Sequence, residues 1–212
     1  MSKALIFDFD GVIVLSEQAR FGVLQRIAQK HGVTIEDDLF NDIVGRTTKY
    51  FFSNSLPEVD QSVLDKILVD NQREYKDKIV DHVVPIAPTT DFIKNYIGHK
   101  KLAVASGSTT AVLDTVLNHL GVLEKFTCIV GQEHVTKHKP DPEVYNLAAS
   151  QLGCVNFDCI VIEDTVIGAQ AAIGAGMSVY ILLNGVNNRA DFDDVNVAGF
   201  LETLEELQQA LA

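Results

Sequence analysis

Residues 4–11 read Ala-Leu-Ile-Phe-Asp-Phe-Asp-Gly, an apolar run that ends in two acids and a glycine. Four consecutive apolar residues are typical of a strand that is buried on both faces of a parallel sheet. Ligands bind at the carboxyl ends of the strands in open sheets of this kind. This segment therefore predicts the first strand of an α/β sheet, together with part of a site at the end of that strand.

Helical patterns alternate with further apolar runs along most of the chain. The predicted strands are Lys3–Phe9, Lys101–Ala105, Thr127–Val130, Cys159–Ile162 and Ser178–Leu183. The predicted helices between the later strands are Thr109–Leu120, Pro142–Leu152 and Thr165–Ala175. Strands that alternate with helices favour a parallel sheet covered on both faces. The predicted fold class is thus α/β, with a Rossmann-like parallel-sheet core.

A block with only helical patterns interrupts this alternation after the first strand. Helical spacing is present in Glu17–His31, Asp38–Val44, Thr47–Asn54 and Asp60–Ile79. Such a block predicts an inserted α-helical cap domain over residues 16–84 and a core domain formed by residues 1–15 and 85–212. We expect the hinges at Val12–Leu15 and Val80–Pro88.

The composition is that of an ordinary globular protein and limits the choice of partners. The 212 residues include 29 acidic and 17 basic side chains, a net charge of −12, which disfavours nucleic acid and anionic membranes. No apolar stretch is long enough for a signal-peptide core or a membrane span. Three cysteines without paired spacing predict reduced thiols and a cytoplasmic location. The sequence leaves the oligomeric state open, a monomer included.

Polar side chains with complementary chemistry follow four of the predicted strands. They are Asp8 and Asp10, Ser106 and Gly107, Lys139, and Glu163 and Asp164. Phosphoryl transfer needs such a set, because a metal ion, a positive side chain and hydroxyl or N–H donors must surround the transferred group. Carboxylates could hold Mg²⁺, and one of them could attack phosphorus to form an aspartyl-phosphate.

These four strand ends resemble, in order, the motifs of the haloacid dehalogenase-like hydrolase superfamily. Asp8-Phe9-Asp10-Gly11-Val12 resembles the first motif and Ser106-Gly107-Ser108 the second. Lys139-Pro140-Asp141-Pro142 resembles the third, and Glu163-Asp164 followed by Gly168 resembles the fourth. The helical block between the first two motifs is similar to the cap of the β-phosphoglucomutase and phosphoglycolate phosphatase-like branch.

The resemblance implies a Mg²⁺-dependent phosphatase that acts on a small phosphorylated metabolite, such as a sugar phosphate, through an aspartyl-phosphate. It implies that Asp8 is the nucleophile and Asp10 the general acid and base. Ser106, Gly107 and Lys139 would bind the phosphoryl group, and Lys139 would also neutralise charge on Asp8. The implied metal ligands are Asp8, Asp10 through its backbone carbonyl, Asp164, and Glu163 directly or through water.

The chain departs from this branch at cap and specificity positions. Leu15 stands where an acid is common, Arg20 where many members have a histidine, and Thr109-Thr110 where mutases have Lys-Asn. These differences weigh against a hexose-phosphate mutase of the β-phosphoglucomutase type, which remains the alternative. A non-enzymatic phospho-acceptor similar to receiver domains is a second alternative, and the size of the helical insertion weighs against it.

Three basic side chains in the helical block are candidate contacts for a second anionic group of the substrate. They are Arg20, Arg46 and Lys49. A solvated charged face of the cap explains the same residues equally well.

Overall fold

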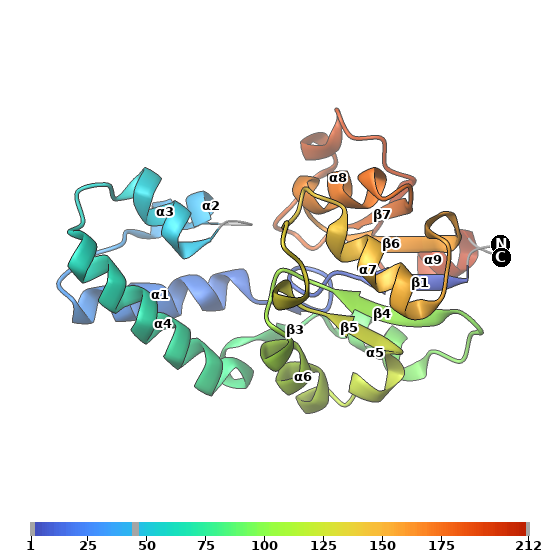
Figure 1. The fold of residues 1–212 in the computed structure, drawn as a ribbon, viewed down its shortest axis with the longest axis horizontal. Helices are drawn as coiled ribbons and strands as arrows, with labels where there is room; N and C mark the ends of the chain where they lie inside the picture. Colours follow the sequence, from blue (N-terminus) through green and yellow to red (C-terminus); the bar gives the residue numbers. More distant parts are fainter. Residues whose placement is uncertain (1–2, 44–46, 211–212) are drawn as a thin grey trace. The chain divides into compact units, whose positions relative to one another are not determined.

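The computed structural model describes residues 3–43 and 47–210 and contains two compact units (Figure 1). The core unit comprises Met1–Val14 and Val84–Ala212, and the helical unit comprises Leu15–Val83. Strands β2 (Val14–Leu15) and β3 (Val84–Pro85) pair with each other where the chain passes from one unit to the other. The predicted fold class is confirmed.

Six parallel strands form the sheet of the core unit, in the order β5-β4-β1-β6-β7-β8. Their bounds are Ala4–Phe7 for β1, Lys101–Ala105 for β4, Cys128–Val130 for β5, Cys159–Glu163 for β6, Ser178–Leu182 for β7 and Gly199–Leu201 for β8. Strand β1 lies between β4 and β6, with Ile6 opposite Ala103 and Val161. All four residues of β1 are buried, as its continuous apolar run requires.

Helices cover both faces of this sheet (Figure 1). Helices α7 (Glu143–Leu152) and α8 (Val166–Gly174) contact each other and the central strands, and their alanines share a core with Ala4 and Ile6. Helix α6 (Thr110–His119) packs beside β5. Helices α5 (Ala87–Asn95) and α9 (Leu204–Ala210) contact each other behind the sheet.

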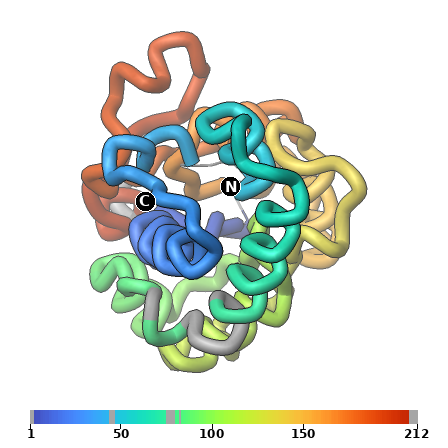
Figure 2. The backbone as a smooth tube through the Cα atoms, turned by 90° about the vertical axis from the view of Figure 1, so that its left-hand side faces the viewer, coloured from blue at the N-terminus to red at the C-terminus, as the bar shows by residue number. Residues whose placement is uncertain are grey.

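The helical unit has its own hydrophobic core. It contains α1 (Glu17–Lys30), α2 (Phe40–Ile43), α3 (Thr48–Ser55) and α4 (Gln61–His82). Helices α1 and α4 lie side by side in both views (Figures 1 and 2). The side chains buried between the helices include Phe21, Leu24, Phe51, Phe52 and Ile67.

The structure corrects several predicted boundaries. The hinge expected at Val80–Pro88 is too long, because α4 continues to His82 and Pro88 lies in the first turn of α5. The segment predicted as helix Asp38–Val44 overlaps a 3₁₀ turn, Asp37–Leu39, which α2 follows, and Val44 lies outside the described residues. Strand β8 and helices α5 and α9 were not predicted; β8 has only three residues, too few to carry periodicity.

Cys128, Cys154 and Cys159 are free thiols, and Cys159 is buried. Among the described helices, none has both the length and the apolar character that a membrane span requires.

Gly153 ends α7 in the left-handed conformation, with φ 64°. A Cβ at this position would approach only Lys101 Nζ, at 4.0 Å, so a side chain here costs backbone strain and little else. We expect Gly153→Ala to lower the free energy of unfolding by about 1 kcal/mol in urea denaturation. Gly153→Asn should lose less, because asparagine tolerates this conformation better. An equal or larger loss for asparagine would contradict this explanation.

Candidate active site

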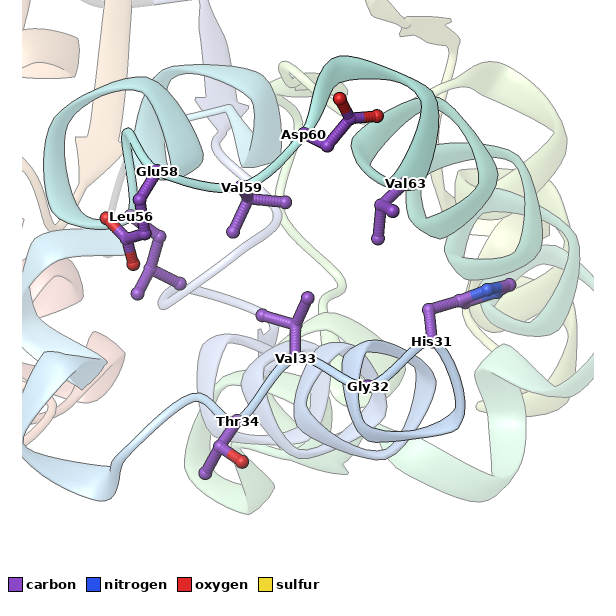
Figure 3. Close-up of a pocket in the computed structure, with 9 residues that line it drawn as sticks. All are labelled: His31, Gly32, Val33, Thr34, Leu56, Glu58, Val59, Asp60 and Val63. Carbon is purple, nitrogen blue, oxygen red and sulfur yellow. The ribbon is translucent and has the colours of Figure 1, made fainter.

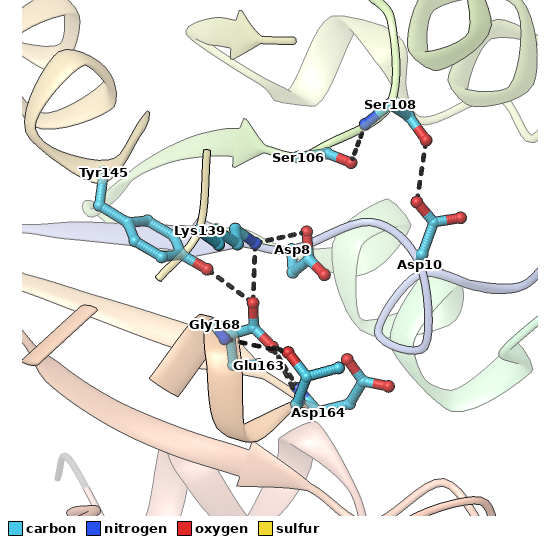
Figure 4. A network of polar contacts seen from close by, with 10 residues as sticks. Asp8, Asp10, Ser106, Ser108, Lys139, Tyr145, Glu163, Asp164 and Gly168 are labelled. Carbon is cyan, nitrogen blue, oxygen red and sulfur yellow. Dashed lines mark hydrogen bonds and ion pairs between the residues drawn. The ribbon is translucent and has the colours of Figure 1, made fainter. Parts of the chain in front are cut away.

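The carboxyl ends of β4, β1 and β6 lie next to one another, and side chains predicted to form the site gather there (Figure 4). Asp8 directly follows β1, Ser106 follows β4 and Asp164 follows β6. Lys139 lies in the segment before α7 and reaches the same place. The parallel order of the strands therefore brings together residues that are far apart in the sequence.

The Lys139 ammonium group is enclosed by three partners. Its Nζ lies 2.9 Å from Asp8 Oδ1 and 2.7 Å from Glu163 Oε1. It also lies 4.8 Å from the centre of the Tyr145 ring. Burial acts to lower the pKa of Lys139, but the two carboxylates outweigh it and hold this pKa well above its usual range. Lys139 is therefore a fixed positive charge beside Asp8.

Both oxygens of Glu163 are occupied by hydrogen-bond donors. Oε1 accepts from Lys139 Nζ and from Tyr145 Oη, the latter at 2.9 Å. Oε2 accepts from the backbone N–H of Asp164 at 2.8 Å and from the N–H and hydroxyl of Thr165, each at 2.9 Å. Burial would raise the pKa of Glu163, but Lys139 and these donors lower it. The clearest effect of Glu163 is to fix Lys139; its role as a metal ligand stays a prediction.

Asp8, Glu163 and Asp164 form a group that fits a divalent cation. One oxygen of each lies within 4.8 Å of the others. Asp164 Oδ1 is buried and has no hydrogen-bond partner among the described residues. A buried carboxylate oxygen without a partner is costly, and a hard cation is the partner that carboxylates accept best. Asp8 and Asp164 are therefore fitted to hold a divalent cation.

Burial also changes the protonation of these two acids. It raises the pKa of Asp8 to about 7, with a smaller contribution from the Glu163 and Asp10 charges and opposition from Lys139. The pKa of Asp164 is raised well above its usual range, first by burial and then by the Glu163 and Asp8 charges. A bound cation would oppose both shifts, because it favours the ionised carboxylates.

Asp10 lies apart from the group formed by Asp8, Glu163 and Asp164. Its Oδ2 accepts a hydrogen bond from Ser108 Oγ at 2.9 Å, while the Ser108 N–H donates to Ser106 Oγ at 3.0 Å (Figure 4). Ser106 itself is buried. The second motif thus positions the Asp10 carboxyl through Ser108. The implied roles of Asp10, Ser106 and Gly107 remain predictions.

Two glycines of the motifs make room for acidic side chains. A Cβ on Gly11 would lie 1.8 Å from Asp164 Oδ2, and φ at Gly11 is +79°. A Cβ on Gly168 would lie 1.6 Å from Glu163 Oε1. Any other residue at either position would displace a carboxylate of the site.

The residues that contact the site and that sequence reasoning missed include Tyr145, Asn184 and Asn187. Tyr145 is buried on α7, where an aromatic side chain is ordinarily part of a core. Asn184 and Asn187 belong to an Asn-Gly-Val-Asn stretch after β7, which in sequence is typical of a turn. For the two asparagines, the only signal in the sequence was their position after another strand of the sheet.

The basic residues predicted as substrate contacts belong to the helical unit. Arg20 Nη1 lies 3.0 Å from Glu17 Oε1 within α1. Lys49 is exposed on α3. Arg46 lies outside the described residues. The assignment of all three to the substrate stays a prediction.

The helical unit contains a hollow of about 390 Å³ between the end of α1 and the start of α4 (Figure 3). Its lining combines the aliphatic side chains of Val33, Leu56, Val59 and Val63 with polar residues such as His31, Glu58 and Asp60. Among the described residues that line it, none belongs to the predicted site. We therefore assign no chemistry to it.

Comparison with known proteins identifies the family. Residues 5–182 match the haloacid dehalogenase-like hydrolase family. The fructose-1-phosphate phosphatase YqaB of Escherichia coli is 30% identical over 175 residues, 82% of this chain and 92% of that protein. The phosphorylated carbohydrates phosphatase of Thermotoga maritima is 26% identical over 193 residues, 88% of each chain.

A solved structure supports the fold. The β-phosphoglucomutase of Clostridium difficile matches with a TM-score of 0.75 and 23% identity, over 99% of this chain and 96% of that chain. Since the family match covers most of the sequence, the chain belongs to the haloacid dehalogenase-like hydrolase family, and it is a hydrolase.

Two glycines of α8 offer a matched test of the crowding around Glu163. In a helix, Gly→Ala is ordinarily stabilising by about 0.5–1 kcal/mol. Gly174→Ala should follow this rule, because its Cβ would meet Pro142 at an ordinary 3.6 Å. Gly168→Ala should instead lower the free energy of unfolding by about 1–3 kcal/mol, because it displaces Glu163. Equal effects of the two substitutions in chemical denaturation would contradict this account.

The raised pKa of Asp8 predicts how cation binding depends on pH. The folded value of about 7 exceeds the ordinary 3.8, so the metal-free folded state holds a proton that the unfolded chain releases. The stability that this proton contributes to the metal-free folded state is complete below about pH 4 and is lost as the pH rises through about 7. A divalent cation must displace this proton, so below pH 7 its apparent dissociation constant should rise up to about tenfold for each unit by which the pH is lowered.

Isothermal titration calorimetry with MgCl₂ at several pH values measures this dependence. Asp8→Asn is the comparison, because it removes one of the two titrating ligands and should make the dependence shallower. Identical dissociation constants across the pH range in the unsubstituted protein would refute the prediction.

Proposed function

We propose that the protein is a Mg²⁺-dependent phosphomonoesterase that acts on a small phosphorylated metabolite through an aspartyl-phosphate intermediate. The observation that carries this proposal is the Asp8–Lys139 ion pair beside Asp164, whose Oδ1 is buried without a hydrogen-bond partner in the described part of the chain. It brings together a carboxylate, a fixed positive charge and a candidate cation ligand at the carboxyl edge of the sheet.

In the first half-reaction, the Asp8 carboxylate attacks the phosphorus of the ester. A bond forms between Asp8 and phosphorus as the bond from phosphorus to the ester oxygen breaks. Asp10 donates its proton to the leaving oxygen, which departs as an alcohol. The hydrogen bond from Ser108 keeps the Asp10 carboxyl oriented for this transfer.

In the second half-reaction, Asp10 accepts a proton from water as the water oxygen attacks the phosphorus. The bond between Asp8 and phosphorus breaks, and inorganic phosphate leaves. Lys139 and the Ser106 hydroxyl stabilise the phosphoryl oxygens in both steps. Mg²⁺, when bound by Asp8 and Asp164, supplies charge neutralisation for the same oxygens.

A sugar phosphate is the proposed substrate class. The relatives compared above include a fructose-1-phosphate phosphatase and a phosphorylated carbohydrates phosphatase, and both align with most of this chain. The basic side chains of the helical unit, Arg20 and Lys49, are the proposed contacts for a second anionic group, and Arg46 is a third by sequence alone.

A screen for phosphate release from a panel of sugar phosphates with MgCl₂ tests both reaction and substrate class. Release of inorganic phosphate supports a phosphatase. Conversion of one sugar phosphate to an isomer without release would indicate a mutase instead. Stable labelling by acetyl phosphate without turnover would indicate a phospho-acceptor module.

Asp8→Asn should lower kcat by roughly three orders of magnitude or more, because the nucleophile is lost. It should also abolish the acid-stable phosphorylated species that mass spectrometry detects after quenching. Asp114→Asn is the control, since it makes the same change on the exposed surface of α6 and should retain full activity. EDTA should remove the activity and MgCl₂ should restore it. Retained turnover in the Asp8→Asn protein would exclude Asp8 as the nucleophile.

A further inference from the structure

The Asn184–Asn187 loop, which follows β7, joins two other loops of the site. Its sequence is Asn-Gly-Val-Asn. Asn184 Nδ2 donates two hydrogen bonds, one to the Gly11 carbonyl at 2.9 Å and one to Asp164 Oδ2 at 3.0 Å. One amide group thus connects the loop after β1 with the loop after β6.

The orientation of the Asn184 amide is fixed from its other side. Asn184 Oδ1 accepts a hydrogen bond from the Val186 N–H at 2.9 Å, as in an Asx turn. The Asn184 N–H in turn donates to Asn187 Oδ1 at 3.2 Å. Because its carbonyl is engaged in the turn, Asn184 can direct only its NH₂ group toward Asp164.

Asn187 holds the main chain of the same aspartate. Its Nδ2 donates to the Asp164 carbonyl at 2.7 Å and to the Leu182 carbonyl at 2.9 Å. The two asparagines therefore fix both the backbone and one carboxylate oxygen of Asp164. Gly11 completes the enclosure, because its missing Cβ leaves space for Oδ2.

The two carboxylate oxygens of Asp164 differ in their hydrogen bonding. Oδ2 is held by Asn184, whereas Oδ1 is buried without a hydrogen-bond partner among the described residues. An amide is suited to this task because it donates without adding charge to a group that already contains Asp8, Glu163 and Asp164. A second carboxylate at this position would instead repel Asp164.

We propose that Asn184 is a positioning residue that strengthens Mg²⁺ binding by holding Asp164 Oδ2, so that Oδ1 is left for the cation. This inference rests on the proposed function, because it assumes a metal site at Asp8 and Asp164. Asn184 itself touches neither the cation nor the substrate.

Calorimetric titration of the full chain with MgCl₂ tests the inference. Asn184→Ala should raise the dissociation constant of Mg²⁺ about 10- to 100-fold, the usual effect of losing the partner of a metal ligand. Asn184→Ser keeps a hydroxyl that can accept from the Val186 N–H, but it cannot reach both Gly11 and Asp164. Asn184→Ser should therefore weaken Mg²⁺ binding as much as Asn184→Ala does, although the turn of the loop is retained. Val186→Ala is the matched control in the same loop and should bind Mg²⁺ like the unsubstituted protein.

Activity provides a second measurement. With a positioning role, kcat at saturating Mg²⁺ should recover in Asn184→Ala and Asn184→Ser, while the Mg²⁺ concentration for half-maximal activity rises by the same factor as the dissociation constant. Thermal unfolding in EDTA shows whether each variant is folded.

The possible failures are distinguishable. Unchanged Mg²⁺ affinity in folded Asn184→Ser, or equal weakening in Val186→Ala, would overturn the role of Asn184 and leave the proposed function intact. An unsubstituted protein that neither binds Mg²⁺ nor releases phosphate would overturn the proposed function together with this inference.

Discussion

Lys139 is the one ammonium group that contacts the carboxylates gathered at the end of the sheet, within the described residues, and it pairs with two of them. Asp8 and Glu163 share its charge, while Asp164 lies beside them without a cationic partner of its own in the described chain. Burial disfavours the ionised form of these acids, and the neighbouring negative charges add to this cost, so the pKa of Asp8 and that of Asp164 are raised. Such a site is matched to a ligand that brings positive charge, namely a divalent cation.

The surrounding residues keep these carboxylates in place against their mutual repulsion. Glu163 is held by Tyr145, Thr165 and backbone N–H groups, and Gly168 gives it space. Asp164 is held by two asparagines from the loop after β7. Glu163 and Asp164 are therefore each held by donors of their own, whereas Asp8 shares Lys139 with Glu163.

The sequence predicted the acids, the serine and the lysine because each directly follows, or lies one loop beyond, a strong apolar strand. It did not predict that Glu163 would be surrounded by donors, since Tyr145 lies in a helix whose pattern is explained by packing alone. It also did not predict the contact between Asn184 and Asp164, because an Asn-Gly pair after a strand is typical of a turn. Strand β8 was missed because three residues carry no periodicity.

The alternation of apolar runs and helical patterns by itself determined an α/β sheet with a helical insertion, and it determined which strand ends carry acids, hydroxyl and lysine. Only the tertiary structure decided that Lys139 lies between Asp8 and Glu163, and that Asn184 holds one oxygen of Asp164 while the other has no partner in the described chain. The physical reason is that periodicity reflects burial, a local property of each segment. The partner of a side chain depends instead on the order in which β4, β1, β6 and β7 pack side by side, and packing across the whole chain sets that order.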